Sequence, residues 1–503
     1  MKIIYKLSFL ILVITFACDE SKLDQINPNQ YKPEQYYIDG NQLTAATNAV
    51  YAQLLGGDLW GRNMQYFSDT RADEHASGGA QLEIHNQQLL VGTYSNSNAA
   101  ISEAWRGHYK IIHRANAVIQ NAPDIEDIAD DVRKQRVAEA RFLRAFGYYN
   151  LNAHWGRVPL YTEVVETLAD TKGPAEESEI FKFLEDELKA IQEDLPWQYV
   201  DANLGRVTQG AVKLLLARVL MQQGKYGDAR PYLLNIYDEG PYSLTPDYHA
   251  NFRSETEYNQ ESIWEIGFAG GGYGWTPDAN TITQKSTIMF QDYNPVGWRN
   301  MIPSEKLINE FENTLIGDAK TDPRMGETII FKGETFGANN EHTLTVEGVE
   351  FQLHGIDTIP AWRKYSPLYK LHPTGYWESD INYRIMRYAE VLLKLAECEN
   401  ELDNIDEALD YLNEIRARQS VDMPAYPTDR YPSSTKEEVR ETIMHEAMVE
   451  FANEKLRVLD LSRWRKNGWF GSNIPEPVGY IATDPEKAIL PYPTSETDRN
   501  PNF

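Results

Sequence analysis

Apolar residues recur every three or four positions along much of the chain, which is the spacing of one face of an α-helix. Between residues 99 and 121, Ile101, Trp105, Ile112 and Ala115 follow this spacing. Pro123 ends the stretch, because proline cannot donate the backbone hydrogen bond that a longer helix needs. The same spacing predicts further helices over residues 41–55, 132–153, 176–194, 208–223, 226–238, 383–401, 405–418 and 435–461.

The helical spacing is absent from two long stretches, residues 58–98 and 242–380. The first mixes Trp and Tyr with Gly, Asn, Ser and Asp, and we expect it to form a loop. In the second, the sequence ESIWEIG at 261–267 predicts a strand. A short helix and two further strands are predicted over 304–311, 328–332 and 343–353. Both stretches are therefore expected to be insertions into a helical scaffold.

Two predicted helical hairpins share the residue spacing of tetratricopeptide repeats. Ala217 and Ala229 are 12 residues apart, and so are Ala396 and Ala408. Small residues at these positions let two antiparallel helices pack closely. Helix 41–55 with 99–121, and 132–153 with 176–194, supply two further pairs. The sequence predicts a mainly α fold: a tetratricopeptide-like scaffold of about four helix pairs with loop-rich insertions and a few short β-strands.

The first twenty residues are typical of an export signal. Two lysines precede the apolar run at 7–16, which at about ten residues is shorter than the roughly 20 that a spanning helix needs. Cys18 follows Ala17 at the point of expected cleavage, and this pattern predicts a lipidated N-terminus at Cys18. An ordinary signal peptide with an incidental cysteine is the alternative interpretation.

These patterns divide the chain into three segments. Residues 1–17 are predicted to be the signal peptide and 18–40 a polar tether that carries the lipid. Residues 41–503 are predicted to form one domain. Its scaffold is expected over about 41–240 and 381–465, with ligand-facing insertions at about 58–98 and 242–380.

Charge and cysteine content exclude several classes of function. The 503 residues include 75 acidic and 48 basic side chains, a formal charge of −27. This charge repels nucleic acid and anionic lipid, and it argues mildly against a strongly polyanionic substrate. Only Cys18 and Cys398 occur, so no Cys-based zinc site is expected, and lipidation of Cys18 would leave no pair for a disulfide. Cys398 is expected in the core.

The motifs of common enzymes are missing from the sequence. His445-Glu446 begins like the zinc-protease motif HExxH, but Val449 stands where the second histidine would be. The glycine-rich run at 270–274 does not follow the dinucleotide-binding pattern. No metal or other cofactor is predicted. Paired carboxylates for glycoside hydrolysis are not singled out by any spacing.

Several charged residues at helical spacing are expected to be structural. Glu446, Glu450 and Glu454 lie four residues apart, with Arg457 three further on, and we expect ion pairs on a helix surface. Arg141 and Arg144 are expected to hydrogen-bond within or between helices.

Sequence blocks along nearly the whole chain resemble the SusD/RagB family, nutrient-binding outer-membrane lipoproteins of the Bacteroidetes. They include AEARFLRAFGYYNL at 138–151, YRIMRYAEVLLKLAECENEL at 383–402 and HEAMVEFANEKLRVLDLSRW at 445–464. The resemblance implies a non-enzymatic, lipid-anchored protein on the cell surface. It also implies a SusC-like TonB-dependent transporter as partner, to which a captured glycan or oligosaccharide is delivered.

No short motif of the family fixes the ligand residues, so we predict them from position and chemistry. Aromatic rings can pack on the C–H faces of sugars, and amide, carboxylate or guanidinium groups can bind their hydroxyls. Trp264, Trp105 and Trp464 are expected in the core. The candidate ligand-binding residues are Trp60, Gln65, Tyr66, Asp69, Tyr273, Trp275, Asp278, Tyr293, Trp298 and Arg299.

Three alternatives to glycan capture remain open at this point. The same type of uptake complex could capture a peptide or glycopeptide. A glycoside hydrolase would need two carboxylates placed in a pocket. An adaptor would use the repeats to bind protein only.

Overall fold

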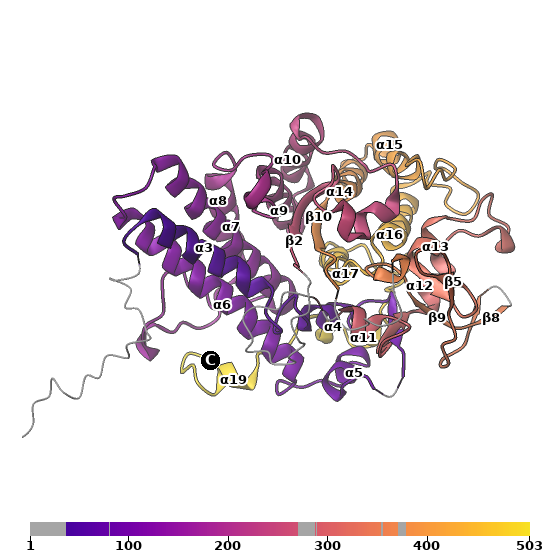
Figure 1. Ribbon diagram of the computed structural model, residues 1–503, viewed down its shortest axis with the longest axis horizontal. Coiled ribbons are helices and arrows are strands. Elements are labelled where there is room, and N and C mark those ends of the chain that lie inside the picture. Colours follow the sequence, from indigo (N-terminus) through magenta and orange to yellow (C-terminus); the bar gives the residue numbers. More distant parts are fainter. Residues whose placement is uncertain (1–36, 80, 270–286, 288, 354–355, 371–378) are drawn as a thin grey trace, which may run out of the picture.

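The structure is a computed structural model that describes residues 37–79, 81–269, 287, 289–353, 356–370 and 379–503. The predicted signal peptide, Cys18, Tyr273, Trp275, Asp278 and the glycine run 270–274 lie outside these residues. Figure 1 shows the N-terminal helices on the left and the C-terminal helices on the right, with strands β2 and β10 between them.

The N-terminal half is a stack of antiparallel helices. Each packs on the next: α3 on α6, α6 on α7, α7 on α8, α8 on α9 and α9 on α10. Their bounds are Gly40–Leu54 (α3), Ala99–Asn121 (α6), Asp130–Trp155 (α7), Glu177–Ile191 (α8), Gln209–Met221 (α9) and Tyr226–Glu239 (α10). The six helices predicted over this half are confirmed to within a few residues.

Side-chain caps fix where several helices begin. Asn98 accepts a hydrogen bond from the backbone N–H of Ile101 at the start of α6, and Thr208 accepts one from Ala211 at the start of α9. Such caps satisfy N–H groups that have no partner within the helix, which stabilises each start by about 1 kcal/mol.

The repeat pattern predicted from alanine spacing is confirmed. α14 (Tyr388–Glu401) and α15 (Ile405–Arg416) form the second hairpin, and α10 packs on α14, so the stack continues into the C-terminal half. Ala217, Ala229, Ala396 and Ala408 are all fully buried. Cys398 is likewise buried in α14, as predicted.

Two predicted helices are partly wrong. Residues 383–387 are not helical: Tyr383–Arg387 is strand β10, which pairs antiparallel with β2 (Ser262–Ile266). The predicted helix 435–461 is broken into α16 (Lys436–Phe451) and α17 (Arg457–Lys466). The turn between them holds Asn453 and Lys455 at φ of 64° and 68°, a left-handed conformation that no α-helix contains.

The expectation of a loop over residues 58–98 is also wrong. This stretch contains α4 (Asn63–Asp69), β1 (His75–Ser77) and α5 (Ile84–Leu90). Every residue of α4 is buried, so tertiary packing forms this helix without an amphipathic pattern that the sequence could reveal.

The second insertion contains short helices and two-stranded sheets. β1 pairs with β3, β4 with β9, β5 with β6 and β7 with β8, all antiparallel. The helix predicted at 304–311 and the strand at 328–332 are confirmed, whereas the strand at 343–353 is two separate strands. The bounds are Met289–Tyr293 (α11), Met301–Pro303 (β3), Glu305–Glu310 (α12), Arg324–Thr328 (α13), Ile329–Phe331 (β4), Thr335–Phe336 (β5), His342–Thr343 (β6), Phe351–Leu353 (β7), Ile356–Thr358 (β8) and Pro360–Trp362 (β9).

One continuous hydrophobic core runs through the helical stack and across the β2–β10 pair. Trp264, Trp105 and Trp464 belong to it, as predicted. Two short helices, α18 (Gly479–Thr483) and α19 (Thr494–Thr497), lie in the C-terminal tail. Within the described ranges no helix is both long and apolar enough to cross a bilayer.

Five basic and six acidic side chains form a buried ionic seam between the β2–β10 pair, α15 and α16. At its centre, Arg387 of β10 lies 2.7 Å from Glu261 and 2.6 Å from Glu450. Arg418 contacts the same two carboxylates at 2.6 and 2.8 Å. The seam consists of Glu261, Glu312, Asp322, Arg324, Lys364, Arg387, Arg416, Arg418, Glu446, Glu450 and Glu454.

The prediction that Glu446, Glu450 and Glu454 form ion pairs on a helix surface is therefore wrong. All three are buried and project into the ionic seam. Arg457 contacts Asp73 at 2.8 Å. The structural role predicted for Arg141 and Arg144 is confirmed, because both donate to Glu187 and so join α7 to α8.

Candidate ligand-binding groove

Most of the predicted ligand residues that the structure describes are buried. Trp60 is 5% exposed and its ring stacks on Phe146 at 5.3 Å. Gln65 in α4 donates to the hydroxyl of Thr287 at 2.9 Å, and the hydroxyl of Tyr66 accepts from Asn300 at 2.8 Å. The prediction that these three residues lie on exposed loops is wrong, because α4 packs into the core.

The structure nevertheless brings residues of both insertions together. The rings of Tyr66 in α4 and Tyr293 in α11 meet edge to face at 5.3 Å, and Tyr293 is buried as well. Lys455 lies 5.0 Å from the centre of the Tyr293 ring and donates to the carboxylate of Asp69. Asp69 and Tyr293 are thus parts of a buried cluster, and their role as ligand contacts stays a prediction.

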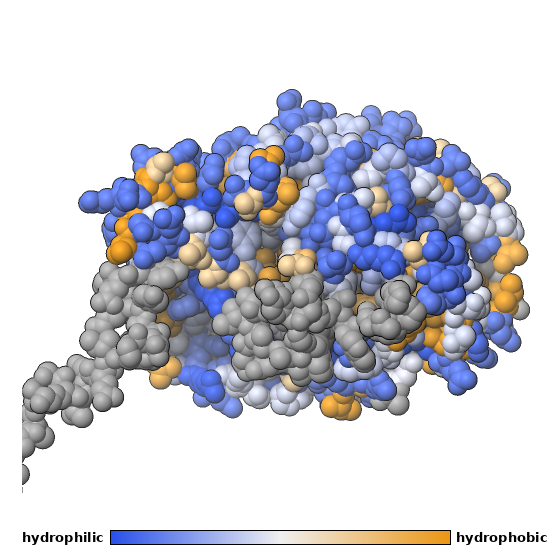
Figure 2. Space-filling model, in the orientation of Figure 1, coloured by the Kyte–Doolittle hydropathy of each residue, from blue (hydrophilic) through white to orange (hydrophobic). Residues whose placement is uncertain are grey.

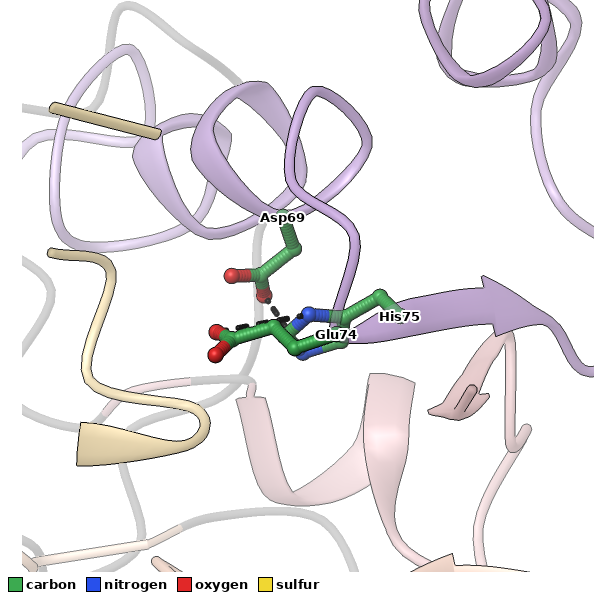
Figure 3. Close-up of side chains that lie close together, drawn as sticks. All are labelled: Asp69, Glu74 and His75. Carbon is green, nitrogen blue, oxygen red and sulfur yellow. Dashed lines mark ion pairs between the residues drawn. The ribbon is translucent and has the colours of Figure 1, made fainter. Parts of the chain in front are cut away.

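Asp69, Glu74 and His75 form the one group within the described residues whose donor atoms are close enough to hold a metal ion. Asp69 projects from the end of α4, and Glu74 and His75 lie where the chain enters β1 (Figure 3). His75 Nε2 is 3.3 Å from Asp69 Oδ2, and His75 Nδ1 is 3.6 Å from Glu74 Oε1.

The chain itself supplies a cation to this cluster. Lys455 Nζ donates to Asp69, and to Asn453 at 2.7 Å. Burial raises the pKa of Glu74 to about 8, with the Asp69 charge adding to the effect. The backbone N–H of Asn453 donates to Glu74 at 3.2 Å, and Lys455 donates to Asp69, so we assign the cluster to joining α4, β1 and the turn after α16.

The last two predicted residues adjoin α11. Trp298 is 36% exposed, and among the described candidates it is the one ring that faces solvent substantially. Arg299 is buried, with φ of 51°, and its guanidinium donates to the carbonyls of Glu347 and Pro360 at 3.0 and 3.1 Å. Arg299 therefore fixes the surrounding loops, and its role as a ligand contact stays a prediction.

A different set of aromatic and polar side chains surrounds an open hollow of about 600 Å³ between α3 and the end of β2. We call it the α3–β2 groove. The surface on the side seen in Figure 2 is mostly hydrophilic, with small apolar clusters. The groove combines both kinds of surface, and its lining includes Tyr51, Leu204, Arg206, Glu257, Tyr258 and Asn382.

Tyr258 lines this groove and also a second hollow of about 230 Å³. Its backbone N–H donates to Glu265 at 2.9 Å. Its hydroxyl lies against two glycines: a Cβ atom would be 2.7 Å from it at Gly267 and 3.1 Å from it at Gly205. Any side chain at Gly267 would displace the ring, so glycine here keeps Tyr258 in the groove wall.

Arg206 lines the same groove and is held by the fold. Its guanidinium donates to Glu139 at 2.7 Å and to Asn48 at 2.8 Å, and it lies 5.9 Å from the centre of the Tyr51 ring. The Tyr51 hydroxyl accepts from the N–H of Val207 at 3.0 Å. Hydrogen bonds within the protein therefore fix Tyr258, Arg206 and Tyr51 in the lining of the groove before any ligand binds.

Glu257 gives the groove a carboxyl whose neutral form is favoured by its surroundings. Burial raises its pKa to about 8, and the charge of Glu265 adds to the effect of burial. The N–H of Asn382 donates to one oxygen of Glu257 at 2.7 Å. A protonated Glu257 can itself donate a hydrogen bond, which suits a ligand with hydroxyl groups.

Only a weak sequence signal marks the groove. Tyr258 is an aromatic residue in the polar run SETEYNQ, and Leu204 is an apolar residue in the polar run DANLGR. Leu204 is exposed in the structure. Tyr258 and Glu257 lie within the predicted insertion 242–380 but are not among the predicted ligand residues, and Leu204 lies outside both predicted insertions.

Comparisons with known proteins indicate the same family for both halves of the chain. The model of the SusD family matches residues 260–503, and a model described as "Starch-binding associating with outer membrane" matches residues 21–221. SusD-like protein P2 of Formosa agariphila is 28% identical and covers 99% of this chain and 98% of its own length. SusD-like protein P25 of the same organism is 26% identical over 89% of this chain and 87% of its own length.

Solved structures share the fold. A SusD-like carbohydrate binding protein from Bacteroides fragilis superposes with a TM-score of 0.76 at 22% identity, covering 93% of this chain and 99% of its own. Surface glycan-binding protein A from Bacteroides thetaiotaomicron, in complex with laminarihexaose, gives 0.71 at 22% identity, with 92% and 98% covered. The two family models match separate segments that together span most of the sequence, in the order that the sequence blocks indicated. The chain belongs to the SusD/RagB family.

Proposed function

We propose that this protein is a cell-surface, lipid-anchored carbohydrate-binding protein that captures an oligosaccharide in the α3–β2 groove. It passes the oligosaccharide to a partner TonB-dependent transporter of the outer membrane. It acts by binding and not by catalysis. The family supports the general role, and two similar solved structures are a carbohydrate binding protein and a surface glycan-binding protein.

The observation that carries the proposal is the composition of the groove. Two tyrosine rings and Leu204 offer apolar faces, and Arg206 and Glu257 offer polar groups around the same hollow. Small-molecule sites commonly combine apolar walls with a few fixed polar groups. A sugar ring has the matching pair of surfaces: C–H groups on its faces and hydroxyls around its edge.

The position of the acids supports binding over hydrolysis. A glycoside hydrolase needs two carboxyl groups that face the same bond. Glu257 is half-buried in the groove wall, but the carboxylate of the neighbouring Glu265 is buried and accepts from the Tyr258 N–H and the Asn382 side chain, both at 2.9 Å. Glu265 is thus occupied in holding the wall.

The experiment is a calorimetric titration of the purified protein with neutral and acidic oligosaccharides and with peptides. Tyr258→Ala is expected to weaken binding of the preferred oligosaccharide by about 2 kcal/mol, roughly 30-fold, which is typical of losing an aromatic anchor. Leu315→Ala, an exposed apolar residue in another connection, is the matched control and is expected to bind as the parent does. Trp298→Ala tests the exposed ring that the sequence predicted.

The outcomes separate the alternatives. Binding of peptides but of no oligosaccharide would replace glycan capture by peptide capture. Equal affinity of the parent and Tyr258→Ala would reject the α3–β2 groove, and loss only in Trp298→Ala would move the site to the loop beside α11.

The lipid anchor is tested separately. Cys18→Ala is expected to release the protein from the outer membrane without changing its thermal unfolding, because the described hydrophobic core is built from residues 43 onward. Membrane fractionation of both proteins is the measurement, and retention of the variant in the outer membrane would contradict anchoring through Cys18.

A further inference from the structure

A second hollow, of about 750 Å³, lies on the outer face of α6, between that helix and the C-terminal tail. We call it the α6–tail groove. The part of its lining used here is Arg106, Tyr109, Lys110, Arg114, Leu168 and Arg499. It shares no lining residue with the α3–β2 groove.

The charge of this groove is opposite to that of the whole chain. Four cationic side chains line it, against the single acid Glu496, in a protein of formal charge −27. Glu496 is already occupied, since it accepts from the indole N–H of Trp105 at 3.2 Å and from the side chain of Asn500 at 3.0 Å. Because the chain has 75 acidic and 48 basic residues, its average composition would not place four cations around one hollow with a single acid.

The cations are only partly neutralised. Arg106 and Lys110 share one carboxylate, that of the buried Asp58, at 3.7 and 3.0 Å. Arg114 donates to the carbonyl of Ala49 at 2.9 Å. Neither Arg114 nor Arg499 forms an ion pair within the described part of the chain. The groove therefore retains positive charge that a ligand can neutralise.

The remaining wall is apolar. The Tyr109 hydroxyl donates to the carbonyl of Pro159 at 2.8 Å, which fixes the ring beside Trp105 at 5.0 Å between ring centres. Leu168 stands at the rim and is 70% exposed. An inorganic anion would use only the cations, whereas a ring that carries anionic groups would use both surfaces.

We propose that the α6–tail groove binds acidic carbohydrate, an oligosaccharide whose sugars carry carboxylate or sulfate groups. Guanidinium groups pair with such oxyanions in a two-pronged geometry. The sugar faces pack on Tyr109 and Leu168. The site is separate from the α3–β2 groove, so the protein has one site for hydroxyl-bearing sugars and another for charged ones.

The test is a calorimetric titration of the purified full chain at 50 and 500 mM NaCl. The ligands are an oligogalacturonate for the carboxylate, a sulfated galactan oligosaccharide for the sulfate, laminarihexaose as the neutral sugar and a short poly-glutamate peptide. The double variant Arg114→Gln with Arg499→Gln removes two unpaired charges. The matched control is Lys134→Gln with Lys182→Gln, which removes two exposed charges elsewhere.

We expect at least one acidic oligosaccharide to bind at low salt, and its affinity to fall at least tenfold in the groove variant and less than twofold in the control. High salt is expected to weaken it further, since exposed charges are screened. Tyr258→Ala should leave this binding unchanged, which separates the proposal from the α3–β2 groove. Absence of binding by both acidic sugars, equal loss in both variants, or tighter binding of poly-glutamate would overturn it.

Discussion

The ionic seam and the α6–tail groove both gather arginines, but their surroundings differ. In the seam, Arg387 and Arg418 are buried and each contacts at least two carboxylates within 2.8 Å. In the groove, Arg106 shares one carboxylate with Lys110, and Arg499 is exposed without an ion pair among the described residues. The arginines of the seam are paired with carboxylates inside the protein, whereas the α6–tail groove retains positive charge that a bound ligand can neutralise.

The difference shows how to separate structural arginines from binding arginines. A buried charge costs several kcal/mol in lost hydration, so it is tolerated only where carboxylates compensate it. An exposed arginine remains hydrated and needs no partner to be stable. The accessibility of the charge and the number of its partners therefore indicate its role better than residue type does.

Removing one acid of the seam is expected to have the largest effect. Glu450→Gln leaves parts of Arg387, Arg418 and Arg324 without a counter-charge in the interior. Breaking such a buried pair typically costs about 3 to 5 kcal/mol of unfolding free energy. Denaturant unfolding followed by circular dichroism is the measurement. Arg499→Gln in the groove is the comparison and should change the unfolding free energy by less than about 0.5 kcal/mol; similar losses in both variants would remove the distinction.

Acid should weaken the ionic seam and so lower the stability of the fold. Burial alone would raise the pKa of Glu261, but the guanidiniums of Arg418 and Arg387 outweigh burial and hold it at about 2. A folded-state pKa below the unfolded value of about 4.3 stabilises the fold above that value, and this stabilisation is lost as the pH falls toward 2. Melting temperature measured from pH 6 to pH 2.5 should fall steeply below about pH 4.5. A flat profile would contradict the electrostatic account of the seam.

Glu257 should show a smaller effect of the opposite sign. Burial raises its folded-state pKa to about 8, so its contribution to stability is present below about pH 4.3 and is lost as the pH rises through 8. Glu257→Gln mimics the protonated carboxyl and should reduce the loss of stability between pH 6 and pH 9. The measurement is the melting temperature of both proteins over that range, and parallel profiles would show that Glu257 is ionised at neutral pH in the fold.

The sequence predicted the helical stack well because its helices are long enough to repeat the helical spacing of apolar residues, as in α6. It failed for α4, a helix of 7 residues that is buried throughout, and for β10, whose short run joins the apolar pattern of α14 without a break. Glu446, Glu450 and Glu454 show why site prediction failed. Spacing of four residues is the same on an exposed and on a buried helix face, and the partners that distinguish them, such as Arg387, come from distant parts of the chain.

The prediction of the binding site failed for the same reason, because local sequence does not show which side chains are exposed. Trp60 and Tyr66 sit among polar residues as Tyr258 does, yet the first two are buried and Tyr258 lines a groove. Local composition cannot tell a ring that faces a ligand from one that faces the core. The convergence of α3, the 202–206 connection and β2 decides which rings remain accessible.

The most direct test of carbohydrate capture is the titration of Tyr258→Ala beside the parent protein and the Leu315→Ala control with neutral oligosaccharides. We predict that the parent and the control bind the same oligosaccharide with equal affinity and that Tyr258→Ala binds it about 30-fold more weakly. Unfolding curves of the three proteins should coincide, so that the loss is one of binding. Equal affinity of all three proteins would contradict the assignment of the α3–β2 groove as the site of capture.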